Sequence, residues 1–278
     1  MLEKKVIPLP GKEDSKHATI YSDSSAPTKS VIIYLHGGAL IYGSRDDLPK
    51  AHLEAFCHSG HPIIAIDYPL CPEATLLEII EDVASSIEWY ISNRVKLFGD
   101  EQKYVLFGRS AGAYLALLML RQNLSEAPSA IISYYGYGVF VNGWYCTPSS
   151  FYIKYPLMPE TCLRKKSGRS NYSLPIQLGY STYVYLRQRG EWGKYLGAYN
   201  ESISTLTGYA ARNAPPVFLA HSVGDTDVPY DEYLALQALF PKAKKFTSYL
   251  SMHDFDSDEC SKDTQELLKE TILFLNDC

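Results

Sequence analysis

The most constraining feature of this 278-residue chain is an apolar run that breaks at a glycine-flanked serine and resumes as an apolar helical pattern. The run is Tyr104–Phe107, the break reads Gly108-Arg-Ser-Ala-Gly112, and the helical pattern follows from Tyr114. A serine on a sharp strand-to-helix turn needs small residues two positions to either side, because larger side chains would collide there. The pattern therefore predicts a nucleophile elbow with Ser110 as the candidate nucleophile.

A second glycine motif lies upstream, directly after another apolar run. Val31–Leu35 is typical of a buried strand and leads straight into His36-Gly37-Gly38-Ala39. Glycines let the backbone turn so that several N–H groups face one point, as an oxyanion hole requires. A plain glycine turn would explain this motif if it stood alone, but the elbow downstream favours an oxyanion hole.

Strands and helices are expected to alternate along most of the chain. The expected strands are 4–8, 17–21, 31–35, 62–66, 104–107, 130–135, 216–221 and 246–250, and the expected helices are 48–59, 75–96, 111–123, 230–239 and 262–276. This alternation predicts an α/β fold with a mostly parallel eight-stranded sheet covered by helices on both faces. In such sheets the working residues gather at the carboxyl ends of the strands.

The loops after the last two expected strands carry the other groups that a serine nucleophile needs. One loop contains Asp225 and Asp227, and the next contains His253. We predict that His253 takes the Ser110 proton as general base and that an acid fixes its tautomer and stabilises the imidazolium. Both aspartates remain candidates at this point, although on an extended segment only one could face His253.

Composition limits the kinds of protein that this can be. With 46% hydrophobic residues the chain can bury a large core, and no linker or repeat divides it. Six scattered cysteines form no metal-ligand pattern, so we expect reduced thiols and no metal. A net charge of −5 without a basic helix argues against nucleic acid, and no segment reaches the length of a membrane span. We expect a cytoplasmic protein without a membrane partner, and the oligomeric state stays open, a homodimer included.

The motifs resemble those of the hormone-sensitive-lipase-like branch of the α/β-hydrolases, which are serine carboxylesterases and lipases. His36-Gly-Gly-Ala39 is similar to that branch's HGGG, Tyr68-Pro-Leu-Cys-Pro-Glu73 to its YRLAPE, and Gly108-Arg-Ser-Ala-Gly112 to its GDSAG. The resemblance implies the α/β-hydrolase fold and an oxyanion hole made by the backbone N–H groups of Gly38, Ala39 and Ala111. It also favours Asp225 over Asp227 as the acid, because Val228-Pro229 then completes the family's D-x-x-V-P.

Three departures from the family pattern carry information. Ala39 replaces the last glycine of HGGG, which a backbone donor tolerates if its φ stays negative. Arg109 stands where the branch usually has an acidic residue, so we expect different salt bridges around the elbow. Asp254 replaces the glycine that commonly follows the catalytic histidine, and it begins an acidic run with Asp256, Asp258 and Glu259. These charges either raise the pKa of His253 and shift activity to higher pH, or form a solvated loop that caps the last helix.

Residues 139–214 break the strand-helix rhythm and predict a lid inserted into a hydrolase core of 1–138 and 215–278. Of these 76 residues, 14 are aromatic. The aromatic rings could line an acyl or alcohol pocket or form the lid's own small core. The segment also carries a net charge of +6, while the rest of the chain carries −11. This asymmetry either holds the lid to the core, which we favour, or draws anionic substrates inward.

Together these features predict a serine hydrolase that cleaves short-chain carboxylic esters through an acyl-enzyme and needs neither metal nor organic cofactor. Its partner would be a small-molecule ester. An amide hydrolase, such as an arylformamidase or a small peptidase, would look the same in sequence. A catalytically silent ligand-binding relative is the alternative from another class, since this fold also serves in binding proteins.

Overall fold

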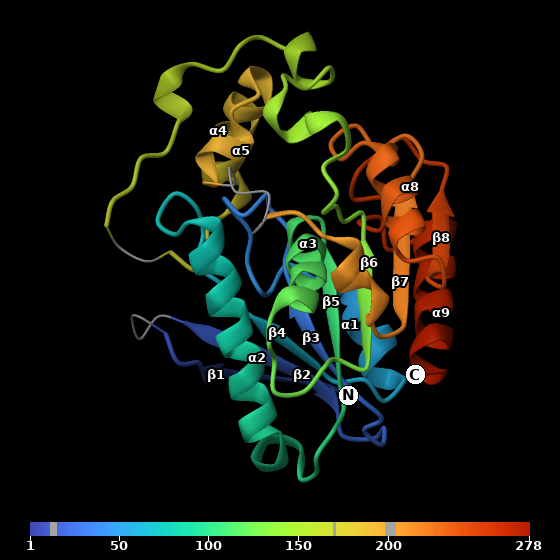
Figure 1. The fold of residues 1–278 in the computed structure, drawn as a ribbon. Coiled ribbons are helices and arrows are strands. Elements are labelled where there is room, and N and C mark those ends of the chain that lie inside the picture. The colour runs from blue at the N-terminus through green and yellow to red at the C-terminus, as the bar shows by residue number, and fades with distance from the viewer. Residues whose placement is uncertain (12–15, 169–170, 198–203) are drawn as a thin grey trace.

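A single sheet forms the centre of the computed structural model, which describes residues 1–11, 16–168, 171–197 and 204–278 (Figure 1). In spatial order its strands are β1 (Leu2–Pro8), β2 (His17–Asp23), β4 (Ile63–Ile66), β3 (Val31–Leu35), β5 (Tyr104–Arg109), β6 (Ala130–Tyr134), β7 (Val217–Ser222) and β8 (Lys244–Ser248). β1 and β2 are antiparallel to their neighbours, and the other strands run parallel to one another. The predicted fold class, a mostly parallel eight-stranded α/β-hydrolase sheet, is confirmed.

Helices cover both faces of this sheet, as predicted. Helices α1 (Lys50–His58) and α9 (Lys262–Asn276) bury their apolar side chains in one core layer. The opposite layer contains α2 (Leu76–Phe98), α3 (Ala111–Leu118) and α8 (Tyr230–Leu239). Every residue of β3, β4, β5, β6 and β7 is buried, which explains why these strands appear in the sequence as continuous apolar runs rather than alternating ones.

Most of the expected elements differ from the structure by one or two residues at an end, and two of the differences are informative. β8 covers Lys244–Ser248 rather than 246–250, because its first residues pair with Phe218 and Leu219 of β7 although they are lysines. Lysine is common on edge strands, where it discourages pairing with other chains. Helix α3 ends at Leu118 instead of 123 and continues as one 3-10 turn to Arg121.

Most of the described segment between β6 and β7 lies beyond the ends of the central strands in Figure 1, and its last part returns beside them. We call its described residues from 139 to 214 the lid. They form η2 (Val141–Cys146), η3 (Tyr152–Lys154), η4 (Glu160–Cys162), α4 (Ile176–Arg189), α5 (Trp192–Tyr195) and α7 (Gly208–Arg212). Arg169 and Glu201, which contribute to the lid's charge, lie outside the described residues. The division into a core of 1–138 with 215–278 and a lid of 139–214 stays a prediction.

A buried carboxylate fixes the start of the lid. Glu232, fully buried on α8, accepts hydrogen bonds from the backbone N–H groups of Gly138, Val139 and Val141 and from the Trp144 indole. A carboxylate with this many donors is well compensated for its burial. The first turn of the lid is therefore tied to the core helix that follows β7.

Candidate active site

Ser110 lies at the sharp junction between β5 and α3, in the strained backbone conformation that an elbow imposes. Its φ is 53° and its ψ is −117°, which is unusual for a residue with a side chain. A Cβ atom on Gly108 would collide with the carbonyl of Gly112, and one on Gly112 would collide with the carbonyl of Leu35. The two glycines are thus required by close backbone contact, as the sequence pattern predicts.

The structure brings Ser110, His253 and one of the two candidate acids together. His253 Nε2 lies 2.8 Å from Ser110 Oγ, and His253 Nδ1 lies 2.7 Å from Asp225 Oδ2. The backbone N–H groups of Asp227 and Val228 donate to the other oxygen of Asp225, at 2.8 and 3.0 Å. The Asp225 carboxylate is therefore fully buried and fixed in orientation toward the imidazole.

Nearby negative charges raise the pKa of the His253 imidazole. Burial lowers the pKa of His253, but the charge and hydrogen bond of Asp225, together with the charges of Asp227 and Asp254, outweigh burial and raise it to about 9. Burial acts to raise the pKa of Asp225, yet the charge of His253 and hydrogen bonds from His221 and His253 hold it well below its usual range. The pair thus favours a charged carboxylate beside a readily protonated imidazole.

The predicted oxyanion loop runs beside the serine. A Cβ atom on Gly37 would lie 3.2 Å from the Arg109 carbonyl oxygen and 3.5 Å from Ser110 Cβ, so the loop and the elbow are in contact. Among the described residues, the N–H groups of Gly38 and Ala39 donate no hydrogen bond. Ala111 is the first residue of α3, where backbone N–H groups have no intrahelical partner. All three N–H groups remain candidates for holding an oxyanion.

The condition under which alanine would easily replace the last glycine, a negative φ at Ala39, is not met, since Ala39 has a φ of 57° and Leu40 has a φ of 62°. The N–H of Ile41 donates to the carbonyl of Gly38 at 2.9 Å, so the loop turns through two consecutive left-handed residues. Strain of this kind persists where the surroundings hold the backbone in place.

Four contacts hold this strained loop. The His36 ring stacks on Tyr68 with centroids 4.1 Å apart, and the Tyr68 hydroxyl donates to the His36 carbonyl at 2.7 Å. The Cys71 N–H donates to the Leu40 carbonyl at 2.8 Å. From the lid, the Trp192 indole donates to the Ala39 carbonyl at 3.2 Å. The Tyr68 to Glu73 motif and the lid thus support the loop, and His36 serves as its anchor.

Arg109 has a partner that sequence reasoning missed. Its guanidinium lies 2.9 Å from Asp256 Oδ1 and donates to the Tyr135 hydroxyl at 2.6 Å, and this hydroxyl donates to the same Asp256 oxygen at 2.7 Å. The Tyr135 ring meets His253 edge to face, with centroids 4.7 Å apart. Asp256 is fully buried and pairs with the elbow instead of belonging to a solvated acidic loop. Asp254 remains exposed beside the imidazole.

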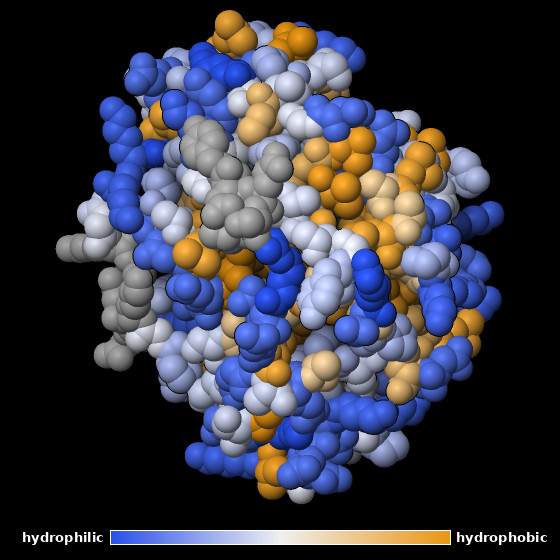
Figure 2. Space-filling view, viewed as in Figure 1, coloured by the Kyte–Doolittle hydropathy of each residue, from blue (hydrophilic) through white to orange (hydrophobic). Residues whose placement is uncertain are grey.

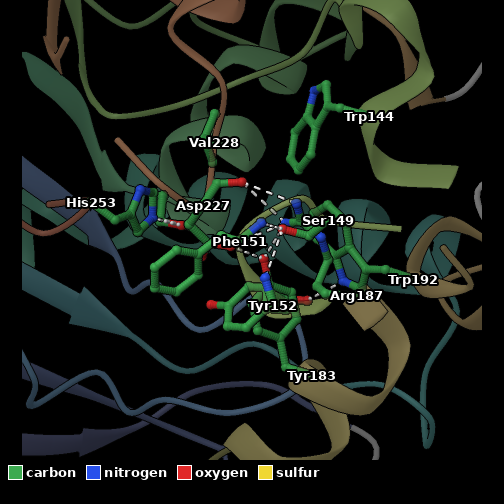
Figure 3. Close-up of polar contacts among 12 residues, drawn as sticks. Trp144, Ser149, Phe151, Tyr152, Tyr183, Arg187, Trp192, Asp227, Val228 and His253 are labelled. Carbon is green, nitrogen blue, oxygen red and sulfur yellow. Dashed lines mark hydrogen bonds and ion pairs between the residues drawn. The ribbon is translucent and has the colours of Figure 1, made fainter. Parts of the chain in front are cut away.

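Asp227 contacts Tyr183 and Arg187 of the lid, within the cluster of polar contacts drawn in Figure 3. Its carboxylate accepts a hydrogen bond from the Tyr183 hydroxyl at 2.7 Å and lies 3.1 Å from Arg187 Nη1. The Arg187 guanidinium is buried and lies 4.8 Å from the centre of the Trp144 ring. This ion pair joins the lid to the core. It is a contact of the kind that we expect if the opposite net charges of lid and core hold them together.

A pocket of about 820 Å³ opens over Ser110. Its core side includes the oxyanion loop, Ser110 and His253, and its lid side includes Phe151, Tyr152 and Tyr180. Among residues 1–11, 16–168, 171–197 and 204–278, no cluster of three or more His, Cys, Asp or Glu side chains is arranged to hold a metal ion. None of the described helices is both long and apolar enough to cross a bilayer.

Comparison with known proteins agrees with this geometry. A family model described as the alpha/beta hydrolase fold matches residues 32–167. The solved structure of a protein of unknown function from Staphylococcus aureus subsp. aureus Mu50 has a TM-score of 0.84 and 28% identity, covering 100% of this chain and 98% of that one. Esterase LipU from Mycobacterium tuberculosis is 31% identical over 109 residues. The non-reducing polyketide synthase adrD from Penicillium roqueforti is 27% identical over 175 residues.

The chain belongs to the α/β-hydrolase superfamily. Within it, the motifs of the chain resemble those of the hormone-sensitive-lipase-like branch, and the relatives that it matches in part include an esterase. The curated alignments cover only parts of these proteins. LipU aligns over 38% of this chain and 35% of its own length, and the polyketide synthase aligns over 59% of this chain and 7% of its own.

Proposed function

We propose that this chain is a serine esterase that cleaves soluble short-chain carboxylic esters through an acyl-enzyme. The observation that carries the proposal is the hydrogen-bonded series from Ser110 through His253 to Asp225, at a nucleophile elbow that opens into a pocket. A serine, a base and an acid that orients the base are the groups that nucleophilic acyl transfer requires.

In this mechanism, Ser110 Oγ attacks the ester carbonyl carbon while His253 Nε2 takes the serine proton. The N–H groups of Gly38, Ala39 and Ala111 stabilise the resulting oxyanion. His253 then gives its proton to the leaving alkoxide, and the acyl group stays on Ser110. Water attacks this acyl-enzyme with His253 again as base, which releases the carboxylic acid and restores the serine.

Two other functions share these residues and can be separated by simple assays. An amide hydrolase, such as an arylformamidase or a small peptidase, would turn over aryl formamides or aminoacyl amides faster than short p-nitrophenyl esters. A silent binding protein would not react with a fluorophosphonate probe. We expect the probe to label Ser110 and the esters to be the better substrates.

We expect kcat/KM on p-nitrophenyl esters to rise over the first few acyl carbons and to fall beyond about six, without interfacial activation. Each methylene that fits the pocket adds about 0.8 kcal/mol until the space is filled. In Figure 2 most of the visible surface is hydrophilic, with apolar side chains at the outer tip of the lid. The exposed apolar residues of the lid are divided between short segments, with Ile153 and Leu157, and the start of α4, with Ile176, Leu178 and Tyr180, so no single amphipathic helix carries them all. Activity that still climbs on long-chain emulsions would identify a lipase instead.

Activity should depend on pH through His253. The base must be neutral to accept the Ser110 proton, so kcat/KM should increase with pH up to about 9, where the imidazole loses its proton. Asp254→Asn removes a charge that raises this pKa and should move the midpoint to lower pH. Glu259→Gln, which removes a nearby exposed charge, is the matched control. Equal midpoints in the wild type and in Asp254→Asn would contradict this assignment.

A further inference from the structure

The charged groups that line the pocket over Ser110 are distributed unevenly between core and lid. The core contributes Asp47, Arg109, Asp227, His253 and Asp254. The lining residues that come from the described part of the lid carry no charge. The lid's excess of lysine and arginine, which in sequence terms could attract anionic substrates, is therefore not found on the described pocket wall.

Two of the five charged groups are compensated by partners behind the pocket wall. The Arg109 guanidinium is paired with the buried carboxylate of Asp256 at 2.9 Å. The Asp227 carboxylate is paired with Arg187 at 3.1 Å. A close opposite charge cancels most of the field that a group would otherwise exert on a ligand. Each ion pair is neutral overall, although the Asp227 carboxylate still acts on Tyr42 and His253.

Two carboxylates of the lining, Asp47 and Asp254, form no ion pair, although their charges act on Arg109 and His253 respectively. Asp47 accepts a hydrogen bond from the Tyr34 hydroxyl at 2.8 Å, which leaves its charge in place. Within the part of the chain that the structure describes, neither Asp47 nor Asp254 forms an ion pair. Burial raises the pKa of Tyr42 in the pocket, and the charges of Asp227, Asp254 and Asp47 contribute to the same shift. Both carboxylates therefore act on the same region of the pocket.

The pocket also offers aromatic surface. Its aromatic lining residues are Tyr42, Tyr135, Phe151, Tyr152 and Tyr180. Tyr42 and Tyr180 meet edge to face with centroids 6.2 Å apart. Aromatic rings attract organic cations through their negative faces, most strongly where water is excluded. Tyr152 already contacts one cation on its lid side, because the Arg187 guanidinium lies 5.9 Å from the centre of its ring.

We propose that the ester substrate carries an organic cation, such as an ammonium or quaternary ammonium group, which binds between the aromatic lining and the carboxylates of Asp47 and Asp254. This inference rests on the proposed esterase function and names the substrate class of the same pocket. Neutral esters of the same shape gain the apolar contacts but not the charge attraction, and anionic esters are repelled.

The test uses pairs of esters that differ only in charge. One pair is acetylcholine and neohexyl acetate, in which a carbon atom replaces the ammonium nitrogen. In this pair the cation belongs to the alcohol half of the ester. The other pair is the p-nitrophenyl ester of γ-trimethylammonium butyrate and its all-carbon analogue, with the cation in the acyl half. We expect kcat/KM for the cationic member of at least one pair to exceed that of the neutral member about tenfold at low salt. Added salt should reduce this ratio because exposed charges are screened.

Variants test whether the two carboxylates cause the preference for the cationic ester. The measured quantity is the ratio of kcat/KM for the cationic ester to kcat/KM for the neutral ester, because a change that affects both esters equally cancels in this ratio. Asp47→Asn and Asp254→Asn should each lower the ratio severalfold, and the double variant should bring it close to one. Asp277→Asn, the same charge change at the far end of α9, should leave the ratio unaltered. A ratio near one in the wild type for both pairs, or a ratio that survives the double substitution, would overturn the inference while esterase activity on the neutral esters still stands. Hydrolysis of none of the four esters would overturn both proposals.

Discussion

Ser110→Ala is expected to reduce kcat/KM for ester hydrolysis by about a thousandfold or more, and His253→Ala by a similar factor. Ser110 supplies the attacking oxygen, and His253 Nε2, 2.8 Å away, removes its proton. Because the two groups act as one unit, the double variant should be little worse than either single variant. The measurement is kcat/KM on a short p-nitrophenyl ester, together with fluorophosphonate labelling, which Ser110→Ala should lose entirely.

The variants must also be folded for this result to count. Ser110→Ala keeps a small residue at the elbow, where Gly108 and Gly112 already accommodate the turn. Thermal unfolding and circular dichroism should therefore stay close to those of the wild type. Rates near the wild-type value in either variant, in preparations free of contaminating esterase, would refute the assignment of nucleophile and base.

The sequence could predict the fold and the position of the site because both depend on local patterns. Glycines two residues either side of Ser110 require a strand-to-helix turn, and continuous apolar runs require strands that are buried on both faces. Once the strands are parallel, the loops that carry Gly38, Ser110, Asp225 and His253 must meet at one edge of the sheet. No long-range information is needed for that step.

The pairing of Arg109 with Asp256 could not be predicted in the same way. These residues are far apart in the sequence, and the chain contains many other acidic residues that could have met the arginine. Only the folded geometry shows that the acidic run after His253 divides, with Asp256 buried behind the elbow and Asp254 exposed at the pocket. The two alternatives considered for this run each omitted the buried ion pair.

The backbone of the oxyanion loop was also beyond sequence reasoning. A positive φ at Ala39 is costly for an isolated residue. Its conformation depends on contacts from distant segments, since Cys71 holds the Leu40 carbonyl and Trp192 holds the carbonyl of Ala39 itself. Substitutions in the lid could therefore alter the oxyanion loop without contacting Ser110.

Asp225→Asn is expected to lower kcat/KM at least tenfold more than Asp227→Asn. Both variants remove one charge two residues apart, so each is the control for the other. Asp225 accepts the Nδ1 hydrogen of His253 at 2.7 Å, and an asparagine there cannot stabilise the imidazolium and favours the wrong tautomer. Asp227 contacts Tyr183 and Arg187, so Asp227→Asn should loosen the lid and lower the pKa of His253 slightly, without removing the base's partner.

The two aspartates differ because the loop that carries them forms a turn. On the extended segment expected from the sequence, only one of them could face His253. The N–H groups of Asp227 and Val228 donate to Asp225 Oδ1, so the acid loop folds around the Asp225 carboxylate and turns its second oxygen toward His253. The Asp227 carboxylate contacts Tyr183 and Arg187 of the lid instead. If steady-state kinetics showed Asp227→Asn to be the more damaging variant, the acid would have to be reassigned and the alignment through Val228-Pro229 abandoned.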